Sequence, residues 1–199
     1  LWSCSQAGRV VGEAEAELPL PQNFQLHFNH RDGARYRSPL TGQWRNGDNL
    51  EEQLIGQIDA AQQEVLVAIQ ELTLPQISKA LIRAKQRGLH VQLVLENNYS
   101  KPWSEQHPSD LSVHSRRRLQ QLQLLADSNR DGRLTAEERL DGDAIALLRR
   151  GGIPVVDDTE DGSRGSGLMH HKFIVVDRSL VITGSANFTS SGMHGDAGA

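Results

Sequence analysis

The chain has 199 residues, of which 37% are hydrophobic and 23% charged, and its formal net charge is −4. This composition excludes a disordered chain, and the longest apolar stretches, at 65–69 and 173–176, fall far short of the roughly 20 residues that span a bilayer. The negative net charge disfavours bulk attraction of nucleic acid, so a polyanionic substrate needs a local binding site.

The first residues resemble the end of a bacterial lipoprotein signal. Residues 1–4 read Leu-Trp-Ser-Cys, and in such signals the cysteine is lipidated after cleavage. The resemblance implies membrane attachment through Cys4 and an extracytoplasmic location, either periplasmic or membrane-anchored. The alternative is an ordinary cysteine in a frayed tail. Residues 5–22 are polar and partly acidic and end in a proline-containing stretch, so we expect a tail and spacer over 1–22 and a folded domain over 23–199.

Alternating and continuous apolar patterns predict the elements that follow. Residues 24–28 alternate apolar and polar side chains, the period of a half-buried strand. Residues 30–48 read as a loop, and Asp48 is a suitable N-cap for a helix with apolar residues at 50, 54, 55 and 58. A continuous apolar strand at 65–69, a helix at 77–87 that ends at Gly88 and a strand at 91–95 come next.

Strand, helix and strand with short connections make a right-handed parallel unit. Strand patterns return at 153–156, 173–176 and 180–183, whereas residues 97–152 read as a mostly helical insertion. We therefore expect an α/β domain. Its sheet is mixed and largely parallel, helices flank both faces, and the helical insertion interrupts it.

The most specific pattern of the chain lies at 170–187. It reads H-x-K-x4-D-x6-G-S-x-N, with polar positions at His170, Lys172, Asp177, Ser185 and Asn187. A core strand with an incidental histidine and a lysine that reaches to solvent would explain His170 alone. It does not explain the whole set in register.

Strand geometry gives these residues a common chemistry. Because side chains alternate on a strand, His170 and Lys172 project to one side and His171 to the other. A neutral imidazole can attack phosphorus while an ammonium neutralises the phosphoryl oxygens. Ser185 and Asn187 repeat the two-residue step and offer a hydroxyl and an amide to the same oxygens.

This pattern resembles the signature of the phospholipase D superfamily, and residues 65–95 resemble the first strand-helix-strand unit of that family. The resemblance implies a phosphodiesterase with a phosphohistidine intermediate, in which His170 is the nucleophile and no metal acts at the reaction centre. It also implies a second motif, whose histidine protonates the leaving oxygen. The chain holds one copy, so we expect either a homodimer or a second motif-bearing half beyond Ala199.

Three acidic residues near the motif need separate interpretation. Asp177 stands at a turn after the strand, where an aspartate commonly bonds local backbone, so a structural role is expected. Glu71 and Glu96 follow the two parallel strands, at the edge where sheets of this kind bind ligands. Each is a candidate for orienting a histidine, and an ordinary solvated carboxylate is the favoured alternative.

Residues 127–138 match the twelve-residue EF-hand calcium loop, including glycine at position six and glutamate at position twelve. The expected Ca²⁺ ligands are Asp127, Asn129, Asp131, Arg133 through its carbonyl, Thr135 and Glu138. A capping box between Thr135 and Glu138 is the alternative, but it leaves the other positions unexplained. A single hand suits millimolar calcium outside a cell.

Two substrate classes present the same phosphodiester to such a site. Nuclease-like hydrolysis is the favoured hypothesis, because Lys101, Arg116, Arg117 and Arg118 in the insertion offer contacts to a phosphate backbone. The alternative is a phospholipase or phosphatidyltransferase acting on membrane phospholipids, which an anchor at Cys4 would favour. An inactive calcium-dependent binding module is a further alternative.

Overall fold

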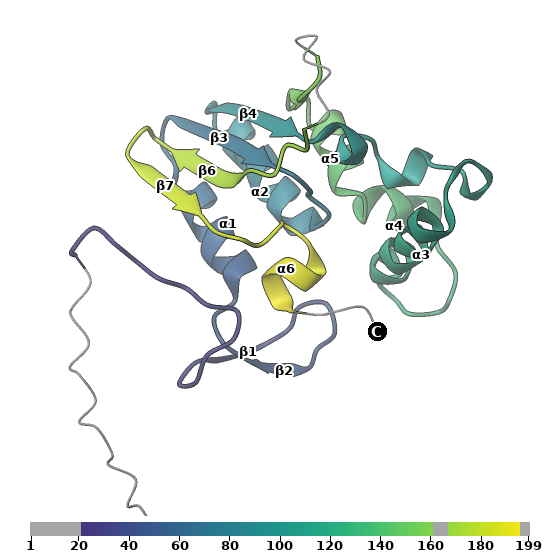
Figure 1. Cartoon of the computed structure of the whole chain (residues 1–199), viewed down its shortest axis with the longest axis horizontal. Coiled ribbons are helices and arrows are strands. Elements are labelled where there is room, and N and C mark those ends of the chain that lie inside the picture. Colours follow the sequence, from purple (N-terminus) through teal and green to yellow (C-terminus); the bar gives the residue numbers. More distant parts are fainter. Residues whose placement is uncertain (1–20, 161–166, 196–199) are drawn as a thin grey trace, which may run out of the picture.

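The computed structural model describes residues 21–160 and 167–195, so the expectations for Cys4 and most of the tail lie outside the described residues. The main element is a five-stranded sheet (Figure 1). In spatial order its strands are β5 (Val155–Asp157), β4 (His90–Leu95), β3 (Glu64–Ile69), β6 (Lys172–Val176) and β7 (Leu180–Thr183). The first three run parallel, whereas β6 and β7 run antiparallel to their neighbours.

The expected mixed sheet flanked by helices is confirmed, but parallel pairs make up half of the strand pairs rather than most of them. The reason lies in the connection that follows β5. β6 starts beside the carboxyl end of β3, where Lys172 pairs with Ile69. The chain therefore stays at that edge and turns back, whereas a parallel strand would need a crossover to the opposite edge.

Three helices pack against one another beside this sheet: α1 (Leu50–Ala60), α2 (Pro75–Gln86) and α5 (Ala144–Arg150). α2 begins with a proline, whose fixed φ suits a first helical turn, and it ends before Gly88, whose φ is 91°. The N-cap of α1 is Asn49 rather than the expected Asp48. The Asn49 side chain accepts a hydrogen bond from the amide of Glu52.

The core lies between these helices and one face of the sheet. On β3, Val65, Val67 and Ile69 are buried on that face, whereas Leu66 and Ala68 on the opposite face are half-buried. Helices had been expected on both faces of the sheet. Within the described residues they cover this one face. The crossovers through α2 and α5 step in the same direction across the sheet, and right-handed crossovers then place both helices on the same side.

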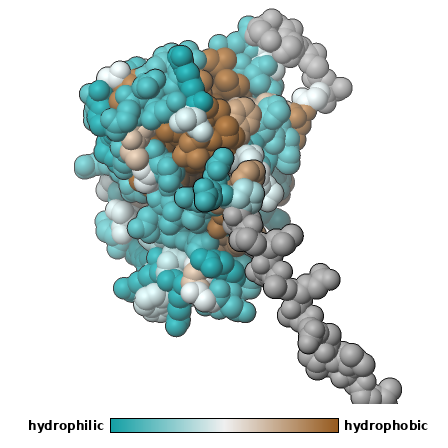
Figure 2. Space-filling model, turned by 90° about the vertical axis from the view of Figure 1, so that its left-hand side faces the viewer, coloured by the Kyte–Doolittle hydropathy of each residue, from teal (hydrophilic) through white to brown (hydrophobic). Residues whose placement is uncertain are grey.

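Residues 24–28, expected as a strand, form no strand. The side chains of Phe24, Leu26 and Phe28 are 63%, 55% and 52% exposed. The segment is held through Phe28, whose amide and carbonyl both bond to Asp48. Because these bonds tie it to the loop before α1, no ladder forms with a strand edge. Figure 2 shows an apolar area on the side of the molecule where β7 lies.

A small hairpin interrupts the expected loop over 30–48. It consists of β1 (Arg35–Arg37) and β2 (Trp44–Asn46), and it lies below α6 (Ser190–His194) in Figure 1. The hydroxyl of Tyr36 lies 3.0 Å from Nδ1 of His194, whose Nε2 lies 2.8 Å from a carboxylate oxygen of Glu51. Glu51 belongs to α1, so this buried chain of contacts joins the hairpin, α6 and α1.

The insertion lies to one side of the sheet in Figure 1. It contains three short 3-10 turns at Asn97–Tyr99, Trp103–Glu105 and Pro108–Asp110, followed by α3 (Val113–Ala126), α4 (Ala136–Asp141) and α5. Trp103, Leu119, Leu122 and Ala126 form its own small core. α5 belongs to the main core instead, through side chains such as Leu148. No helix within 21–160 or 167–195 is long and apolar enough to cross a bilayer.

Candidate active site

The two halves of the 170–187 motif meet at the carboxyl end of β3. β6 begins at Lys172, whose side chain is buried, and His170 lies exposed two residues earlier. The Lys172 ammonium donates to the side-chain oxygen of Gln70 and to the backbone carbonyl of His170, both at 3.1 Å. Asn187 donates from its amide to the same Gln70 oxygen, also at 3.1 Å. The side-chain oxygen of Gln70 therefore bonds to residues from both halves of the motif.

Backbone hydrogen bonds hold this arrangement in register. The amide of Gln70 donates to the carbonyl of His171 at 3.0 Å, and the amide of Phe188 donates to the carbonyl of Glu71 at 3.1 Å. The amide of Thr73 donates to the carbonyl of Phe188 at 2.9 Å. The segment after β3 is thus clamped to the start of β6 on one side and to the residues after Asn187 on the other.

Both adjacent histidines lie exposed before the start of β6. His171 is exposed and its ring meets the edge of Phe173, with ring centroids 5.8 Å apart. Lys172 lies on the buried side of β6, as Ile174 does. The His170 ring has no hydrogen-bond partner among the described residues, which leaves both of its nitrogens available to a substrate.

Electrostatics at Lys172 favour a phosphate ligand. Burial lowers the pKa of the Lys172 ammonium below its ordinary value, because desolvation disfavours the charged form. A cation that has lost water interacts more strongly with a phosphoryl oxygen than one in bulk solvent. The side-chain oxygen of Asn187 is also buried and has no donor within the described ranges.

Asp177 lies at the opposite end of β6, roughly 16 Å along the strand from Lys172 at 3.3 Å per residue. Its carboxylate accepts hydrogen bonds from the amides of Gln62, Gln63 and Glu64, the shortest at 2.7 Å. These bonds hold the pKa of Asp177 below its ordinary value. The structure therefore places Asp177 away from the other motif residues, as a link between β6 and the residues that enter β3.

Neither interpretation of Glu71 and Glu96 survives. Glu71 receives two hydrogen bonds from the guanidinium of Arg118, at 2.9 and 2.5 Å. Glu96 is 3% exposed and accepts bonds from the amide and the side chain of Asn98. Neither carboxylate contacts a histidine among the described residues, and neither is simply solvated. A tertiary contact from the insertion decides the environment of Glu71, whereas Glu96 caps the short turn at Asn97–Tyr99 through a local contact with Asn98.

A groove of about 870 Å³ reaches the motif from the side of β7. Residues 22–29, α1 and β7 line it, together with Lys172, Gly184 and Ser185. Most of its wall is apolar, from residues such as Phe28 and Leu54. Ser185 and Lys172 thus both line this groove. The groove itself was not predicted from the sequence.

In the loop over 127–138, side chains bond to the loop's own backbone. Asp127 accepts from the amides of Asp131 and Gly132, Asn129 from the amide of Asp131, and Asp131 from the amide of Arg133. Gly132 has a φ of 77°, which favours glycine. The loop folds back on itself, with these oxygen-bearing side chains directed at amides of the same loop.

The capping box considered for this loop is present. The Thr135 hydroxyl accepts from the amide of Glu138, and the Glu138 carboxylate accepts from the amide of Thr135. Ser128 donates twice to the other Glu138 oxygen. These bonds lower the pKa of Glu138 to about 2. No group of three His, Cys, Asp or Glu side chains converges for a metal in the described residues, so Ca²⁺ binding stays a prediction.

Comparison with known families agrees with the motif. The family model described as "Cardiolipin synthase, PLD-like domain" matches residues 54–197, which include every position of the motif. The chain belongs to the phospholipase D superfamily. Its phospholipase D-type domain is thus built around the sheet described above, with the 97–152 insertion inside the matched region.

The curated relatives of this phospholipase D-type domain are mitochondrial cardiolipin hydrolases. The mouse protein is 44% identical over 55 residues, which cover 28% of this chain and 23% of the mouse protein. The Xenopus laevis protein is 25% identical over 142 residues, covering 71% and 47% of the two chains. The chain spans between a fifth and a half of the length of these relatives.

Two solved structures are also similar. Nuc from Salmonella typhimurium is 24% identical with a TM-score of 0.44, and the match covers 72% of this chain and 67% of that one. NucT from Helicobacter pylori is 19% identical with a TM-score of 0.38, covering 71% and 69%.

Sequence reasoning missed one residue of this site. Gln70 is 7% exposed and touches both halves of the motif, yet it belongs to no part of the pattern. The available signal was a polar residue placed directly after the apolar run at 65–69.

Proposed function

We propose that the chain cleaves phosphodiesters through a phosphohistidine at His170. The observation that carries the proposal is the convergence of Lys172 and Asn187 on one oxygen of Gln70, together with the bond from the Lys172 ammonium to the backbone carbonyl of His170. The His170 ring has no hydrogen-bond partner among the described residues. Nε2 or Nδ1 of His170 attacks phosphorus, the bond to the leaving oxygen breaks, and that oxygen takes up a proton. Water then attacks phosphorus, loses a proton to the group that protonated the leaving oxygen, and the bond between phosphorus and His170 breaks. Lys172 and Asn187 stabilise the phosphoryl oxygens in both steps.

The leaving oxygen needs a proton from a second imidazole, since such general acid catalysis is commonly worth roughly a hundredfold or more. His171 lies on the opposite side of β6 from Lys172. We therefore propose that the second histidine comes from another copy of the motif. A second subunit related by two-fold symmetry, or a second half of the same protein, would supply it.

We propose a phospholipid as the substrate. The groove that contains Lys172 and Ser185 is mostly apolar, which suits an acyl or glycerol portion better than a charged polynucleotide. The relatives are named cardiolipin hydrolases, and the matching family model is named for cardiolipin synthase. A net charge of −4 disfavours long polyanions.

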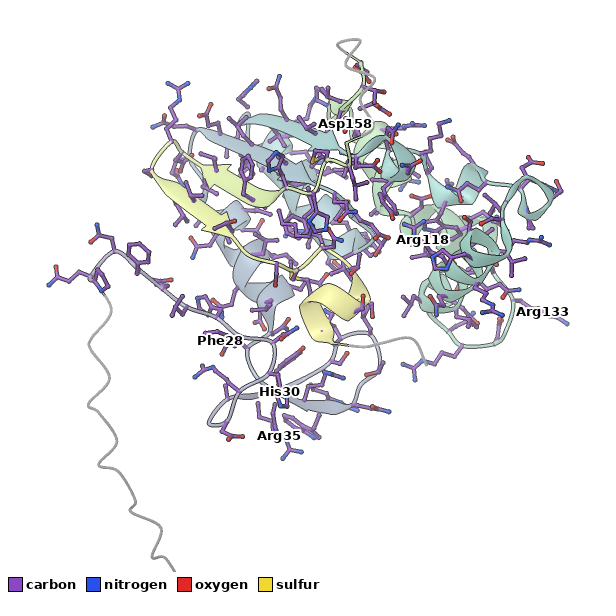
Figure 3. The ribbon with its side chains drawn as sticks, in the orientation of Figure 1. Phe28, His30, Arg35, Arg118, Arg133 and Asp158 are labelled. Carbon is purple, nitrogen blue, oxygen red and sulfur yellow. The ribbon has the colours of Figure 1, made fainter. Side chains whose placement is uncertain are left out.

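Nucleic acid remains the second candidate, because Arg116 and Arg117 are exposed on α3. Arg118 is less available, since it binds Glu71 and its guanidinium lies 5.1 Å over the ring of Tyr99. Figure 3 shows Arg118 on the side of the insertion that faces the sheet and Arg133 on the far side. A phosphate backbone that followed α3 would therefore meet two of the three adjacent arginines.

Substrate assays in EDTA separate these candidates. Vesicles that contain cardiolipin or phosphatidylglycerol, single-stranded DNA and duplex DNA are each incubated with wild type and with His170→Asn. We expect His170-dependent release of a lipid headgroup and no cut DNA. His170-dependent cleavage of DNA with intact lipid would overturn the lipid assignment. Turnover that persists in His170→Asn would overturn the phosphohistidine mechanism.

We also propose that the 127–138 loop binds Ca²⁺ in a structural role. The donor set consists of oxygens from Asp127, Asn129, Asp131, Thr135, Glu138 and the Arg133 carbonyl, which suits a hard cation. The low pKa of Glu138 keeps its carboxylate ionised at neutral pH. When bound, the ion would tie α3 to α4, and it supplies no chemistry to the phosphodiester.

Finally, we propose an extracytoplasmic location with lipid attachment at Cys4. The signal-like residues 1–4 support this proposal. Radiolabelled palmitate should enter the wild-type protein in a bacterial host and should be absent from Cys4→Ser. Equal labelling of the two proteins would overturn the attachment.

A further inference from the structure

Gln70 occupies a position at which an apolar residue would be expected. The residues before it, 65–69, form a continuous apolar strand, and Gln70 is itself 7% exposed. A buried amide is costly unless its polar atoms are bonded. Its oxygen accepts from Lys172 and from Asn187, each at 3.1 Å, and its backbone amide donates to the carbonyl of His171. Gln70 therefore contacts three residues of the motif segment.

Counting donors shows what these bonds leave for a ligand. The Lys172 ammonium has three N–H groups, and two of them go to Gln70 and to the carbonyl of His170. The Asn187 amide has two N–H groups, and one goes to Gln70. Each side chain keeps one N–H that no described residue accepts. Because both side chains bond to one oxygen, the two nitrogen atoms that carry these remaining N–H groups are neighbours.

We propose that Gln70 is the positioning residue of this site, whose single amide oxygen holds Lys172 and Asn187 so that their remaining N–H groups bind one phosphoryl group. The inference rests on the proposed phosphodiesterase function and adds a residue outside the family pattern. Gln70 acts through Lys172 and Asn187 and does not touch the substrate.

The neutrality of the Gln70 side chain is part of the proposal. A carboxylate at the same place would form an ion pair with Lys172 and cancel the charge that attracts a phosphate. An apolar side chain would leave the ammonium and the Asn187 amide without a buried acceptor. A glutamine accepts both hydrogen bonds and leaves the full positive charge of Lys172 for the ligand.

Two variants of Gln70 test the proposal, and matched changes at Gln92 serve as controls, since Gln92 is exposed on β4. Gln70→Met keeps the length of the side chain and removes the acceptor. Gln70→Glu keeps both acceptor contacts, so it folds even where the methionine variant does not. Thermal melting first establishes that each variant is folded at the assay temperature.

The first readout needs no turnover. The pKa of Lys172 is measured by NMR of isotopically labelled lysine, assigned with Lys172→Arg, and inorganic phosphate is titrated as the probe. Gln70→Glu should raise the Lys172 pKa by about 1–3 units, the usual effect of an opposite charge within a few ångströms. Its affinity for phosphate should fall about tenfold or more, because the added carboxylate repels the anion. The Gln92 variants should match wild type in both measurements.

The second readout is kinetic. Gln70→Met should lower kcat on the phosphodiester substrate about tenfold or more and change KM little, because misplaced donors act mainly on the transition state. A folded Gln70→Met with kcat and phosphate affinity within twofold of wild type would refute the positioning role. An unchanged Lys172 pKa in Gln70→Glu would refute it independently. If wild type binds phosphate but turns over no phosphodiester, the proposed function fails, while the pKa and phosphate titrations still decide the role of Gln70.

Discussion

At the scale of single residues, the proposed nucleophile and the groups proposed to stabilise the phosphoryl oxygens lie in different environments. His170 is exposed and unpartnered within the described residues, whereas Lys172 is buried and held by two acceptors. Charge that develops on phosphoryl oxygens therefore meets donors that are already in place, and such preorganisation is usually the largest electrostatic contribution to catalysis.

The adjacent histidines offer a matched test of this assignment. His170→Asn should lower the turnover of a phosphodiester by about a thousandfold or more, because loss of a covalent nucleophile removes the reaction path. His171→Asn should stay within about threefold of wild type, because the exposed His171 ring meets Phe173 on the other side of the strand. Steady-state kinetics on the two folded variants is the measurement. Equal losses would contradict the assignment of faces.

Asp177 should affect stability in a pH-dependent manner. Bonds from three backbone amides depress its pKa in the folded state. A depressed carboxylate stabilises the fold above its unfolded pKa of about 3.9, and this contribution is lost as pH falls through the lower folded value. Asp177→Asn, which tolerates the φ of 52°, should lower the melting temperature at pH 7. The difference from wild type should narrow below about pH 4. A gap that is independent of pH would rule out this explanation.

At the scale of elements, an ion pair joins the insertion to the stretch that follows β3. Arg118 of α3 bonds to Glu71, the residue that follows Gln70. Both side chains are partly buried, with exposed fractions of 29% and 17%. The carbonyl of Glu71 also accepts from the amide of Phe188, so the insertion and the motif share this short stretch after β3.

Replacing Arg118 should therefore differ from replacing its neighbour. Arg118→Ala leaves a partly buried carboxylate without its partner and should lower the free energy of unfolding by about 1–2 kcal/mol. Arg117→Ala, on the exposed side of α3, should change it by about 0.5 kcal/mol or less. Denaturant unfolding of the two variants measures the difference. Equal effects would show that the contact with Glu71 adds nothing to stability.

Calcium should act on the insertion and not on the chemistry. Ca²⁺ at about one hundred times its Kd should stabilise the folded protein by about 2.7 kcal/mol, because a ligand of the native state raises its stability. Asp127→Ala with Glu138→Gln should abolish the resulting rise in melting temperature, and Mg²⁺ should reproduce little of it. EDTA should leave the rate unchanged well below the melting point. Complete loss of activity in a folded, EDTA-treated protein would place a metal in the mechanism.

At the scale of the whole molecule, the proposed mechanism requires two imidazoles. The 199 residues carry one motif, and a groove at the side of the domain is lined by Lys172, Gly184 and Ser185. If two copies of this chain form the site, specific activity should rise with protein concentration and level off when sedimentation shows a dimer. A strictly monomeric chain with constant specific activity at all concentrations would contradict the need for a second motif.

The sequence by itself determined the features that depend on local spacing. The apolar run at 65–69 specifies a buried strand whichever strands pair with it. The shared face of His170 and Lys172 stays a prediction, because β6 begins only at Lys172. The capping box of Thr135 and Glu138 likewise lies within four consecutive residues. Such features were predictable because their geometry follows from the backbone repeat alone.

The tertiary structure decided the contacts between segments far apart in the chain. Gln70 meets Asn187 across 117 positions and Arg118 meets Glu71 across 47, and no local pattern encodes either pair. The return of β6 beside β3 also turned the expected parallel edge antiparallel. Residues 24–28 have the alternation of a strand but form none, because a strand exists only where another edge accepts its hydrogen bonds.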